Sequence, residues 1–207
     1  FFSIVKKKIF EEAEINQLRN YFKEKNFFNK GIELLDFEPD EFLLNFILSK
    51  KLIHFLKQSL NEDFYFIGGS VIQKNNRTEK IAKYHKDSGK LHQTRIISKK
   101  KNLYGKIGIM LQDNIKGDGG GIDYLKPMIF DNFSDDYSIL NKIRAFYYFL
   151  QDKLFDTHLN TRSGDVIFFS AMLSHRTSFT KKERLKFIKD KYVIYNQITN
   201  LNLIKDV

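Results

Sequence analysis

The stretch Phe64-Tyr65-Phe66-Ile67, followed directly by Gly68-Gly69, marks a change of pattern that decides the fold class. Before it, apolar residues recur at helical spacing over 11–25 and 41–60, with charged residues between them. After it come short runs rich in β-branched and aromatic residues, at 64–67, 91–97, 104–111, 166–169 and 187–197. One helical stretch, 136–154, interrupts these runs. Helices followed by many short strands predict an α+β protein whose sheet part is a sandwich or barrel.

The arrangement along the chain favours one domain. We expect Asp40 to cap the second helical stretch, which starts directly after it. The sequence shows no internal repeat and no low-complexity linker beyond the glycine cluster at 117–121. We therefore expect one domain over 1–207, in which a helical part, 1–62, packs on the sheet of a core at 63–200.

Composition excludes several kinds of site. The 207 residues include 21 Phe and 10 Tyr but no Trp, so aromatic rings supply much of the core. Cysteine is absent, which excludes disulfides, thiolate metal sites and a cysteine nucleophile. No apolar run is long enough to span a bilayer, and no secretory signal pattern is present. We expect a cytoplasmic protein.

The net charge of +10 bears on the binding partners. It comes from 35 Lys and Arg against 25 Asp and Glu, and the lysines form short, scattered clusters at 6–8, 50–51, 99–101 and 181–182. A nucleic-acid interface more often shows one continuous basic stripe with interleaved aromatics, so a solvated lysine-rich surface is favoured. The sharper interpretation is attraction of a small anionic substrate that carries phosphate or carboxylate groups.

Three ligand-type side chains predict a metal centre. In Tyr84-His85-Lys86-Asp87, His85 and Asp87 are two residues apart, so an extended backbone points both to one face. His175 follows the strand-like run Gly164-Asp165-Val166-Ile167-Phe168-Phe169. Two imidazoles and one carboxylate form the ligand set of non-heme Fe(II) oxygenases, which leaves positions open for a co-substrate and O2.

The triplet His-x-Asp is by itself a weak signal, and the other histidines offer alternatives. His and Asp co-occur by chance in many loops, so the motif depends on its structural context. His54 lies in the amphipathic stretch 41–60, where a packed or surface role is favoured. His92 and His158 lack a matching partner, although either substitutes for a ligand if the register is wrong.

Four segments in this order resemble phytanoyl-CoA dioxygenase-like proteins. These are Tyr84 to Asp87, Ile109-Met110-Leu111-Gln112-Asp113-Asn114, Gly119-Gly120-Gly121-Ile122-Asp123-Tyr124, and the run from Gly164 through His175. The resemblance covers about 64–200 and implies a double-stranded β-helix, a jelly roll related to the cupins, with N-terminal helices and a helical insertion. It also implies Fe(II), 2-oxoglutarate and O2 as cofactor and co-substrates.

The resemblance assigns roles to further residues. His85, Asp87 and His175 fall on the metal ligands, and Arg184, nine residues past His175, falls on the cation that holds the 2-oxoglutarate carboxylate. Arg176, directly after His175, competes with Arg184 for this role. Thr177 and Tyr104 stand where the family has further contacts to the co-substrate. The candidate contacts to an anionic substrate are Lys83, Gln93 and Arg95.

The sequence departs from the family in its substrate pocket. Tyr84 replaces a frequent Trp, and Pro127 leads into Met128-Ile129-Phe130 instead of the usual Gly-Ser-His. Asp87 argues against halogenation, because halogenating relatives carry a small residue there. The expected reaction is hydroxylation, with the segment 136–154 and the loop 97–103 near the substrate mouth. The alternatives are a cupin-like metal-binding protein or isomerase without 2-oxoglutarate, an oxidative nucleic-acid demethylase, and a lost enzyme that retains only the fold.

Overall fold

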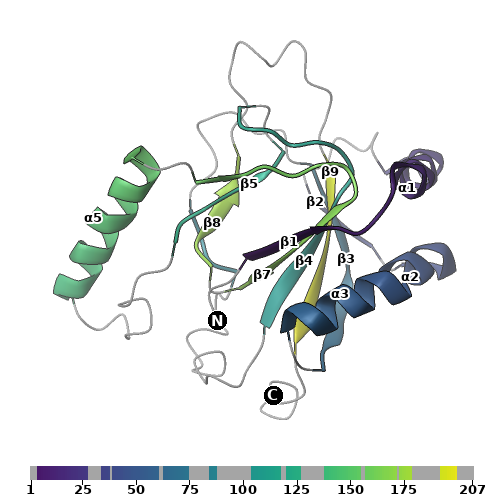
Figure 1. Ribbon diagram of the computed structural model, residues 1–207, viewed down its shortest axis with the longest axis horizontal. Coiled ribbons are helices and arrows are strands. Elements are labelled where there is room, and N and C mark those ends of the chain that lie inside the picture. Colours follow the sequence, from purple (N-terminus) through teal and green to yellow (C-terminus); the bar gives the residue numbers. More distant parts are fainter. Residues whose placement is uncertain are drawn as a thin grey trace.

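The computed structural model (Figure 1) describes residues 4–27, 34–37, 39–60, 63–74, 84–87, 104–117, 120–126, 138–154, 157–171, 173–178 and 192–199. The predicted strand at 91–97 lies outside these residues. No described helix is both long and apolar enough to cross a membrane.

The N-terminal part contains strands as well as helices. Its elements are β1 (Ile4–Lys8), α1 (Glu12–Glu24), β2 (Leu34–Phe37), α2 (Glu41–Ile47) and α3 (Lys50–Leu60). The expected helix over 41–60 is wrong in its continuity, because α2 ends before Leu48 and α3 follows Ser49. The carbonyl of Ser49 accepts from the N–H of Ile53 at 3.0 Å, which is the first backbone bond of α3. The Asp40 cap is confirmed, since its side chain accepts from the Leu43 N–H at 3.2 Å.

A six-stranded antiparallel sheet forms the scaffold. Its other strands are β3 (Tyr65–Lys74), β4 (Tyr104–Met110), β7 (Asp165–Ser170) and β9 (Tyr192–Thr199), and the order is β1-β7-β4-β9-β3-β2. The sequence predicted the end of a strand at Gly68-Gly69, but β3 continues through both glycines. A register shift between Ile67 and Val71 accommodates them, which is the usual role of glycine inside a strand.

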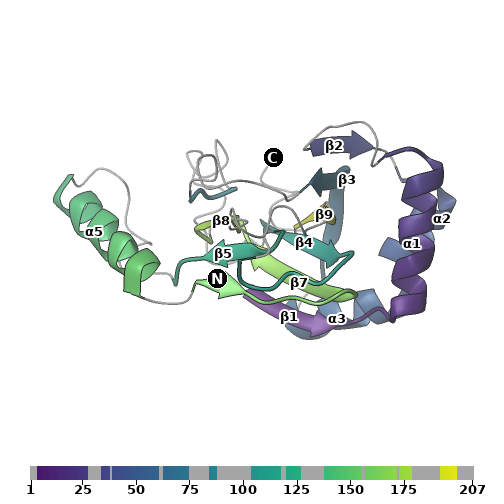
Figure 2. The same cartoon turned by 90° about the horizontal axis from the view of Figure 1, so that it is seen from above.

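The helices α1, α2 and α3 gather at one end of the molecule, against one face of this sheet (Figures 1 and 2). Alternate residues of β4, Ile107 and Ile109, pack there with Leu18, Leu52 and other buried side chains. The helical stripes read from the sequence therefore cover the sheet as the 3.6-residue period requires.

The other face of the large sheet meets a three-stranded sheet of order β6-β5-β8, in which β5 is Ile122–Tyr124, β6 is His158–Leu159 and β8 is His175–Thr177. Met110, Ile167 and Phe169 of the large sheet share one buried cluster with Ile122 of the small sheet. Two antiparallel sheets packed over a common apolar layer make the predicted double-stranded β-helix, or jelly roll.

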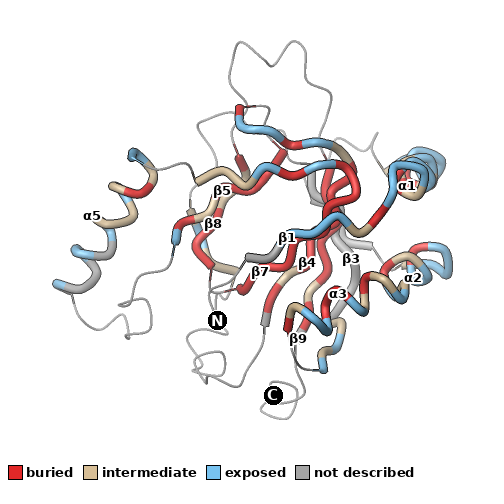
Figure 3. The backbone as a smooth tube through the Cα atoms, in the orientation of Figure 1, coloured by how far each residue is buried: buried red, intermediate tan, exposed pale blue. Residues whose placement is uncertain are grey.

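Helix α5 (Ser138–Leu154) confirms the predicted helical insertion, and it lies at the end of the molecule opposite α1 and α2 (Figures 1 and 2). Figure 3 shows that much of its surface is exposed, in contrast to the buried strands. The exposed side chains include Ile139, Phe146 and Phe149.

Candidate metal centre

His85, Asp87 and His175 converge in space as the sequence predicted. One ligand atom of each lies within 4.8 Å of the other two, and no other group of metal-ligand side chains in the described part of the chain meets this criterion. His85 Nε2 lies 3.7 Å from Asp87 Oδ1, and His175 Nε2 lies 3.4 Å from Asp87 Oδ2. Both imidazoles therefore present Nε2 toward one carboxylate.

A backbone bridge places the two histidines side by side. The N–H of His85 donates to the carbonyl of His175, and the N–H of His175 donates to the carbonyl of His85, both at 2.9 Å. Residues paired in this way across antiparallel strands project their side chains to the same face, and the two ring centroids are 4.6 Å apart. The small sheet thus extends through β8 to the segment 84–87.

His175 is held as a neutral imidazole. Its Nδ1 lies 2.9 Å from the carbonyl of Leu173, which fixes the proton on Nδ1 and leaves the Nε2 lone pair toward Asp87. Burial lowers the pKa of His175, and it outweighs the charge of Asp87 and the Leu173 carbonyl, which favour the protonated form. Phe169 packs edge-on against the ring at 4.8 Å. A buried, oriented, neutral imidazole is the form that binds a metal ion.

Asp87 fits a metal ion in a second respect. Its Oδ2 atom is buried and makes no hydrogen bond with the described residues, although Lys106 Nζ forms an ion pair with it at 3.0 Å. A buried carboxylate oxygen with only an ion pair retains lone pairs for coordination. The donor set of two imidazole nitrogens and one carboxylate oxygen is the set that non-heme Fe(II) oxygenases use.

Lys106 is the site residue that sequence reasoning missed. Lys106, two and four residues before Gly108 and Met110, lies on the same face of β4 as they do. This is the face between the two sheets, where the Lys106 side chain is 25% exposed. A single lysine within the apolar run 104–111 was the available signal. The neighbouring Tyr195 ring lies 5.9 Å from its ammonium group.

The side chain of Arg176 points away from the three metal ligands. Arg176 lies between His175 and Thr177 in β8, so its side chain leaves the opposite face of the strand. Its Nε donates to Asp123 Oδ2 at 3.2 Å and its Nη2 donates to Asp152 Oδ1 at 2.9 Å. Thr177 shares the face of His175, opposite Ile122 of the layer between the sheets.

Other predicted site residues fall outside the description. Arg184, Lys83, Gln93 and Arg95 lie outside the described residues. Tyr104 begins β4, but its side chain is not described.

His158 takes no part in the metal centre. Its side chain is 4% exposed on the outer face of the small sheet, where Nδ1 lies 3.1 Å from Asp123 Oδ1 and 2.8 Å from Ser178 Oγ. Ser178 Oγ also donates to Asp123 Oδ1 at 2.6 Å. Serine and aspartate thus meet the same ring nitrogen, whereas nucleophilic catalysis places them on opposite nitrogens of the histidine. The cluster has the form of a buried, mutually satisfied polar group.

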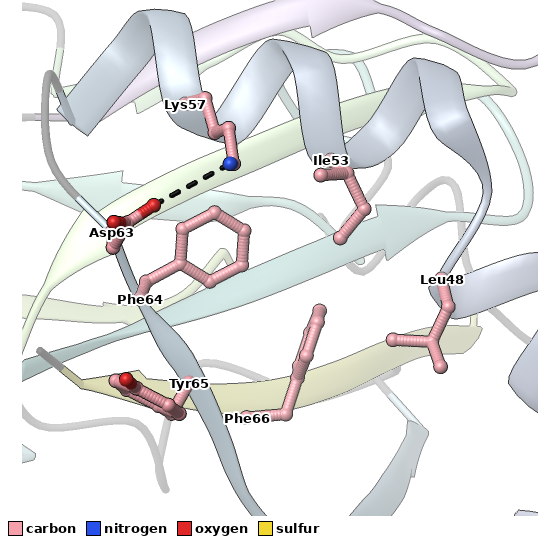
Figure 4. Close-up of a pocket in the computed structure, with 7 residues that line it drawn as sticks. All are labelled: Leu48, Ile53, Lys57, Asp63, Phe64, Tyr65 and Phe66. Carbon is pink, nitrogen blue, oxygen red and sulfur yellow. Dashed lines mark ion pairs between the residues drawn. The ribbon is translucent and has the colours of Figure 1, made fainter.

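A pocket lies on the helix-covered side of the large sheet, between α3 and the start of β3 (Figure 4). Phe64 and Phe66 of its lining pack toward the core beneath the helices, and Lys57 and Asp63 form an exposed ion pair at 3.4 Å. The complete lining is Leu48, Ile53, Lys57, Asp63, Phe64, Tyr65 and Phe66. With one carboxylate and no imidazole, it lacks the donors of a metal site.

Comparisons with solved structures show the same fold. HygX from Streptomyces hygroscopicus with nickel and 2-oxoglutarate bound has a TM-score of 0.65 at 14% identity, over 97% of this chain and 83% of that chain. The viral collagen prolyl hydroxylase from Paramecium Bursaria Chlorella virus-1 gives 0.56 at 14%, over 96% and 90%. SnoK, a non-heme alpha ketoglutarate dependent carbocyclase from nogalamycin biosynthesis, gives 0.63 at 12%, over 96% and 80%.

By sequence, neither a protein-family model nor a curated protein matches the chain. The jelly-roll fold is shown, and the finer resemblance to phytanoyl-CoA dioxygenase-like proteins stays a prediction.

Proposed function

We propose that the protein is an Fe(II)- and 2-oxoglutarate-dependent dioxygenase that hydroxylates a C–H bond of a small organic substrate. The observation that carries this proposal is the convergence of His85, Asp87 and His175 between the sheets of a jelly roll. HygX and SnoK support it, because HygX of the same fold has 2-oxoglutarate bound and SnoK is alpha ketoglutarate dependent.

The residues of this chain have separate tasks in the proposed reaction. His85, Asp87 and His175 would hold Fe(II). The bound metal would supply the oxidation of 2-oxoglutarate by O2 to succinate and CO2, with the second oxygen atom going to the substrate C–H bond. The Leu173 carbonyl keeps the proton of His175 on Nδ1, so Nε2 stays available. Apolar side chains such as Phe169 and Ile167 exclude water from the layer behind the centre. Asp87 supports hydroxylation over halogenation, since it fills a ligand position.

The co-substrate carboxylate needs a cation. Arg184 and Thr177 remain our proposal from the family resemblance, with Tyr104 as a further contact. Lys106 adds a described cation that faces the centre, and a bound metal ion would compete with it for Asp87. Lys106 would then be available to a carboxylate group.

Substrate and domain organisation complete the proposal. The net charge of +10 supports an anionic substrate with phosphate or carboxylate groups. HygX supports a small-molecule substrate, because its structure with hygromycin B bound matches this chain with a TM-score of 0.58. We also propose that 1–62 and 63–200 form one domain, because β1 and β2 of the first part pair with β7 and β3 of the second.

The test is metal binding by a His85→Ala variant, with His54→Ala as the matched control. His54 is an exposed histidine of α3, remote from the centre. We expect wild type and His54→Ala to bind one equivalent of Co(II), used in place of Fe(II), and to form succinate with Fe(II), O2 and 2-oxoglutarate. His85→Ala should do neither. Equal Co(II) binding by His85→Ala and wild type would refute the site.

Metal binding without binding of 2-oxoglutarate would favour the cupin-like alternative. Isothermal titration of the Co(II)-loaded wild type with 2-oxoglutarate distinguishes these outcomes without requiring the true substrate.

A further inference from the structure

A second cluster lies directly behind the two histidines. Tyr84 precedes His85 and Arg176 follows His175, so the backbone bridge between the histidines also brings Tyr84 and Arg176 opposite each other. The guanidinium carbon of Arg176 lies 4.1 Å from the centre of the Tyr84 ring. Because neighbouring residues of extended backbone point to opposite faces, this stacked pair lies on the reverse side of the strands that carry the imidazoles.

Asp152 of α5 joins the stacked pair. Its Oδ1 accepts from Tyr84 Oη at 2.9 Å and from Arg176 Nη2 at 2.9 Å. The Tyr84 hydroxyl also lies 3.1 Å from Thr157 Oγ1. One carboxylate thus ties the segment of His85 and the strand of His175 together.

The helix that supplies Asp152 is anchored at that end. Gln151, the preceding residue, is buried and brackets the backbone of Lys126, with its Oε1 2.8 Å from the Lys126 N–H and its Nε2 2.7 Å from the Lys126 carbonyl. Toward the N-terminus of α5, the side chains of Ile139 and Phe146 are 71% and 63% exposed. Asp152 therefore sits at the part of α5 that is fixed to the small sheet.

The two histidines differ in how packing supports them. The imidazole of His175 is 8% exposed and bonded to Leu173, whereas that of His85 is 56% exposed. Packing therefore contributes less to the position of His85, and the contacts of the adjacent Tyr84 contribute more.

We propose that Tyr84, Arg176 and Asp152 form a clamp that positions His85 against His175 for metal binding. The clamp rests on the proposed metal centre, since it acts on two of its three ligands. Its three members lie on the opposite face of the strands from the metal ligands and would act through His85 and His175, so they are positioning residues. Loss of the Tyr84 hydroxyl leaves the ring and its stacking in place but releases the segment from α5 and from Thr157.

The N-terminal helices contain a matched trio. Tyr21 of α1 bonds to Asp40, the N-cap of α2, and together burial and this hydrogen bond raise the pKa of Tyr21 to about 12. Lys25 lies 5.7 Å from the Tyr21 ring centre and 3.5 Å from Asp40 Oδ2. This trio also combines a cation, a tyrosine and an aspartate, but none of its members adjoins a metal ligand.

The experiment compares wild type, Tyr84→Phe and Tyr21→Phe. For each protein we would measure the dissociation constant of Co(II) by titration and the midpoint of thermal unfolding without metal. The clamp predicts that Tyr84→Phe binds Co(II) about tenfold more weakly, in the range that supporting groups of metal ligands show. Tyr21→Phe should bind Co(II) as wild type does, although its midpoint of thermal unfolding should shift by about as much as that of Tyr84→Phe.

A second variant guards against a specific defect of the phenylalanine. Asp152→Asn keeps the size of the side chain and removes the charge that both Tyr84 and Arg176 contact, so it should weaken Co(II) binding as well. Co(II) binding equal to wild type in both Tyr84→Phe and Asp152→Asn would overturn the clamp and leave the metal centre intact. A wild-type protein that binds no Co(II) would overturn the centre and the clamp together.

Discussion

The six-stranded sheet and the three-stranded sheet are stabilised by different interactions. The large sheet buries apolar side chains on both faces, with Ile107 and Phe168 toward the helices and Met110 toward the small sheet. The small sheet carries charged and polar residues, of which Asp123 and His175 are buried. A substitution that leaves a cavity destabilises an apolar core, whereas a substitution that removes one partner of a buried ion pair destabilises the fold by leaving the other charge unpaired. The apolar scaffold therefore lies mainly in the large sheet and the candidate metal centre mainly beside the small sheet, so different kinds of substitution should destabilise each.

The largest effect should come from the large sheet. Phe168→Ala removes a ring that is 1% exposed at the middle of β7, and we expect it to lower the free energy of unfolding by about 4 kcal/mol. Urea denaturation measures this loss, with Phe146→Ala as the control, because Phe146 is 63% exposed on α5. A loss below about 1 kcal/mol for Phe168→Ala would contradict the assignment of the scaffold to apolar packing.

The small sheet should show a smaller loss through a different mechanism. Asp123→Asn removes the charge that faces Arg176, His158 and Ser178, and we expect a loss of about 2 kcal/mol at pH 7. The matched control is Asp63→Asn, which breaks an exposed ion pair with Lys57 and should change stability by less than about 0.5 kcal/mol. Equal losses in both variants would contradict the comparison.

The stabilisation by the Asp123 carboxylate should depend on pH, and the direction of this dependence follows from the pKa of Asp123. Burial opposes ionisation of Asp123, but hydrogen bonds from His158 and Ser178 and the charge of Arg176 outweigh it and lower the pKa below the usual 3.8. The carboxylate therefore stabilises the fold above its unfolded pKa, and this stabilisation is lost as the pH falls through the folded pKa. Urea denaturation from pH 6 to pH 3 should show the difference between wild type and Asp123→Asn shrinking below about pH 4.

The smallest effect tests a residue that joins the two regions. Lys106 belongs to the large sheet but faces the centre, and Lys106→Met should weaken 2-oxoglutarate binding to the Co(II)-loaded protein about tenfold. Co(II) binding itself should not weaken, because the lysine competes with the metal for Asp87. Calorimetric titration measures both, and Lys57→Met on α3 serves as the control. Weaker Co(II) binding would show that Lys106 supports the metal instead of the co-substrate.

Local sequence patterns predicted the elements that local forces determine. Helical spacing was sufficient to predict α1 and α5, because each spans more than one helical turn. Apolar runs were sufficient to predict β4 and β7, because each is long enough for a strand pattern to show. Strand β1 was missed because three of its five residues are lysines, which is typical of an edge strand but reads as a surface loop. Strands β6 and β8, with two and three residues, are too short for any periodicity.

The site divides in the same way. The spacing of His85 and Asp87 indicated a shared face, the strand-like run before His175 indicated the third ligand, and the family resemblance pointed to the same three residues. Contacts that depend on cross-strand register were not predictable, including Lys106 beside Asp87 and Asp152 between Tyr84 and Arg176. Register is set by tertiary packing, so a partner that lies 24 or 68 positions away, as Asp152 does from Arg176 and Tyr84, gives no local signal in the sequence.

Strand β1 also has a bearing on solubility. It pairs with the outer edge of β7, whose sequence Asp165-Val166-Ile167-Phe168-Phe169-Ser170 has the β-propensity, apolar character and low charge of an aggregation-prone segment. Because β1 covers β7, the edge of the large sheet is β1 itself. Its residues Lys6, Lys7 and Lys8 are exposed, and their charges disfavour pairing with a strand of another copy. The lysines of β1 have the position and charge of gatekeeper residues, since they flank an apolar strand and disfavour its pairing with another copy.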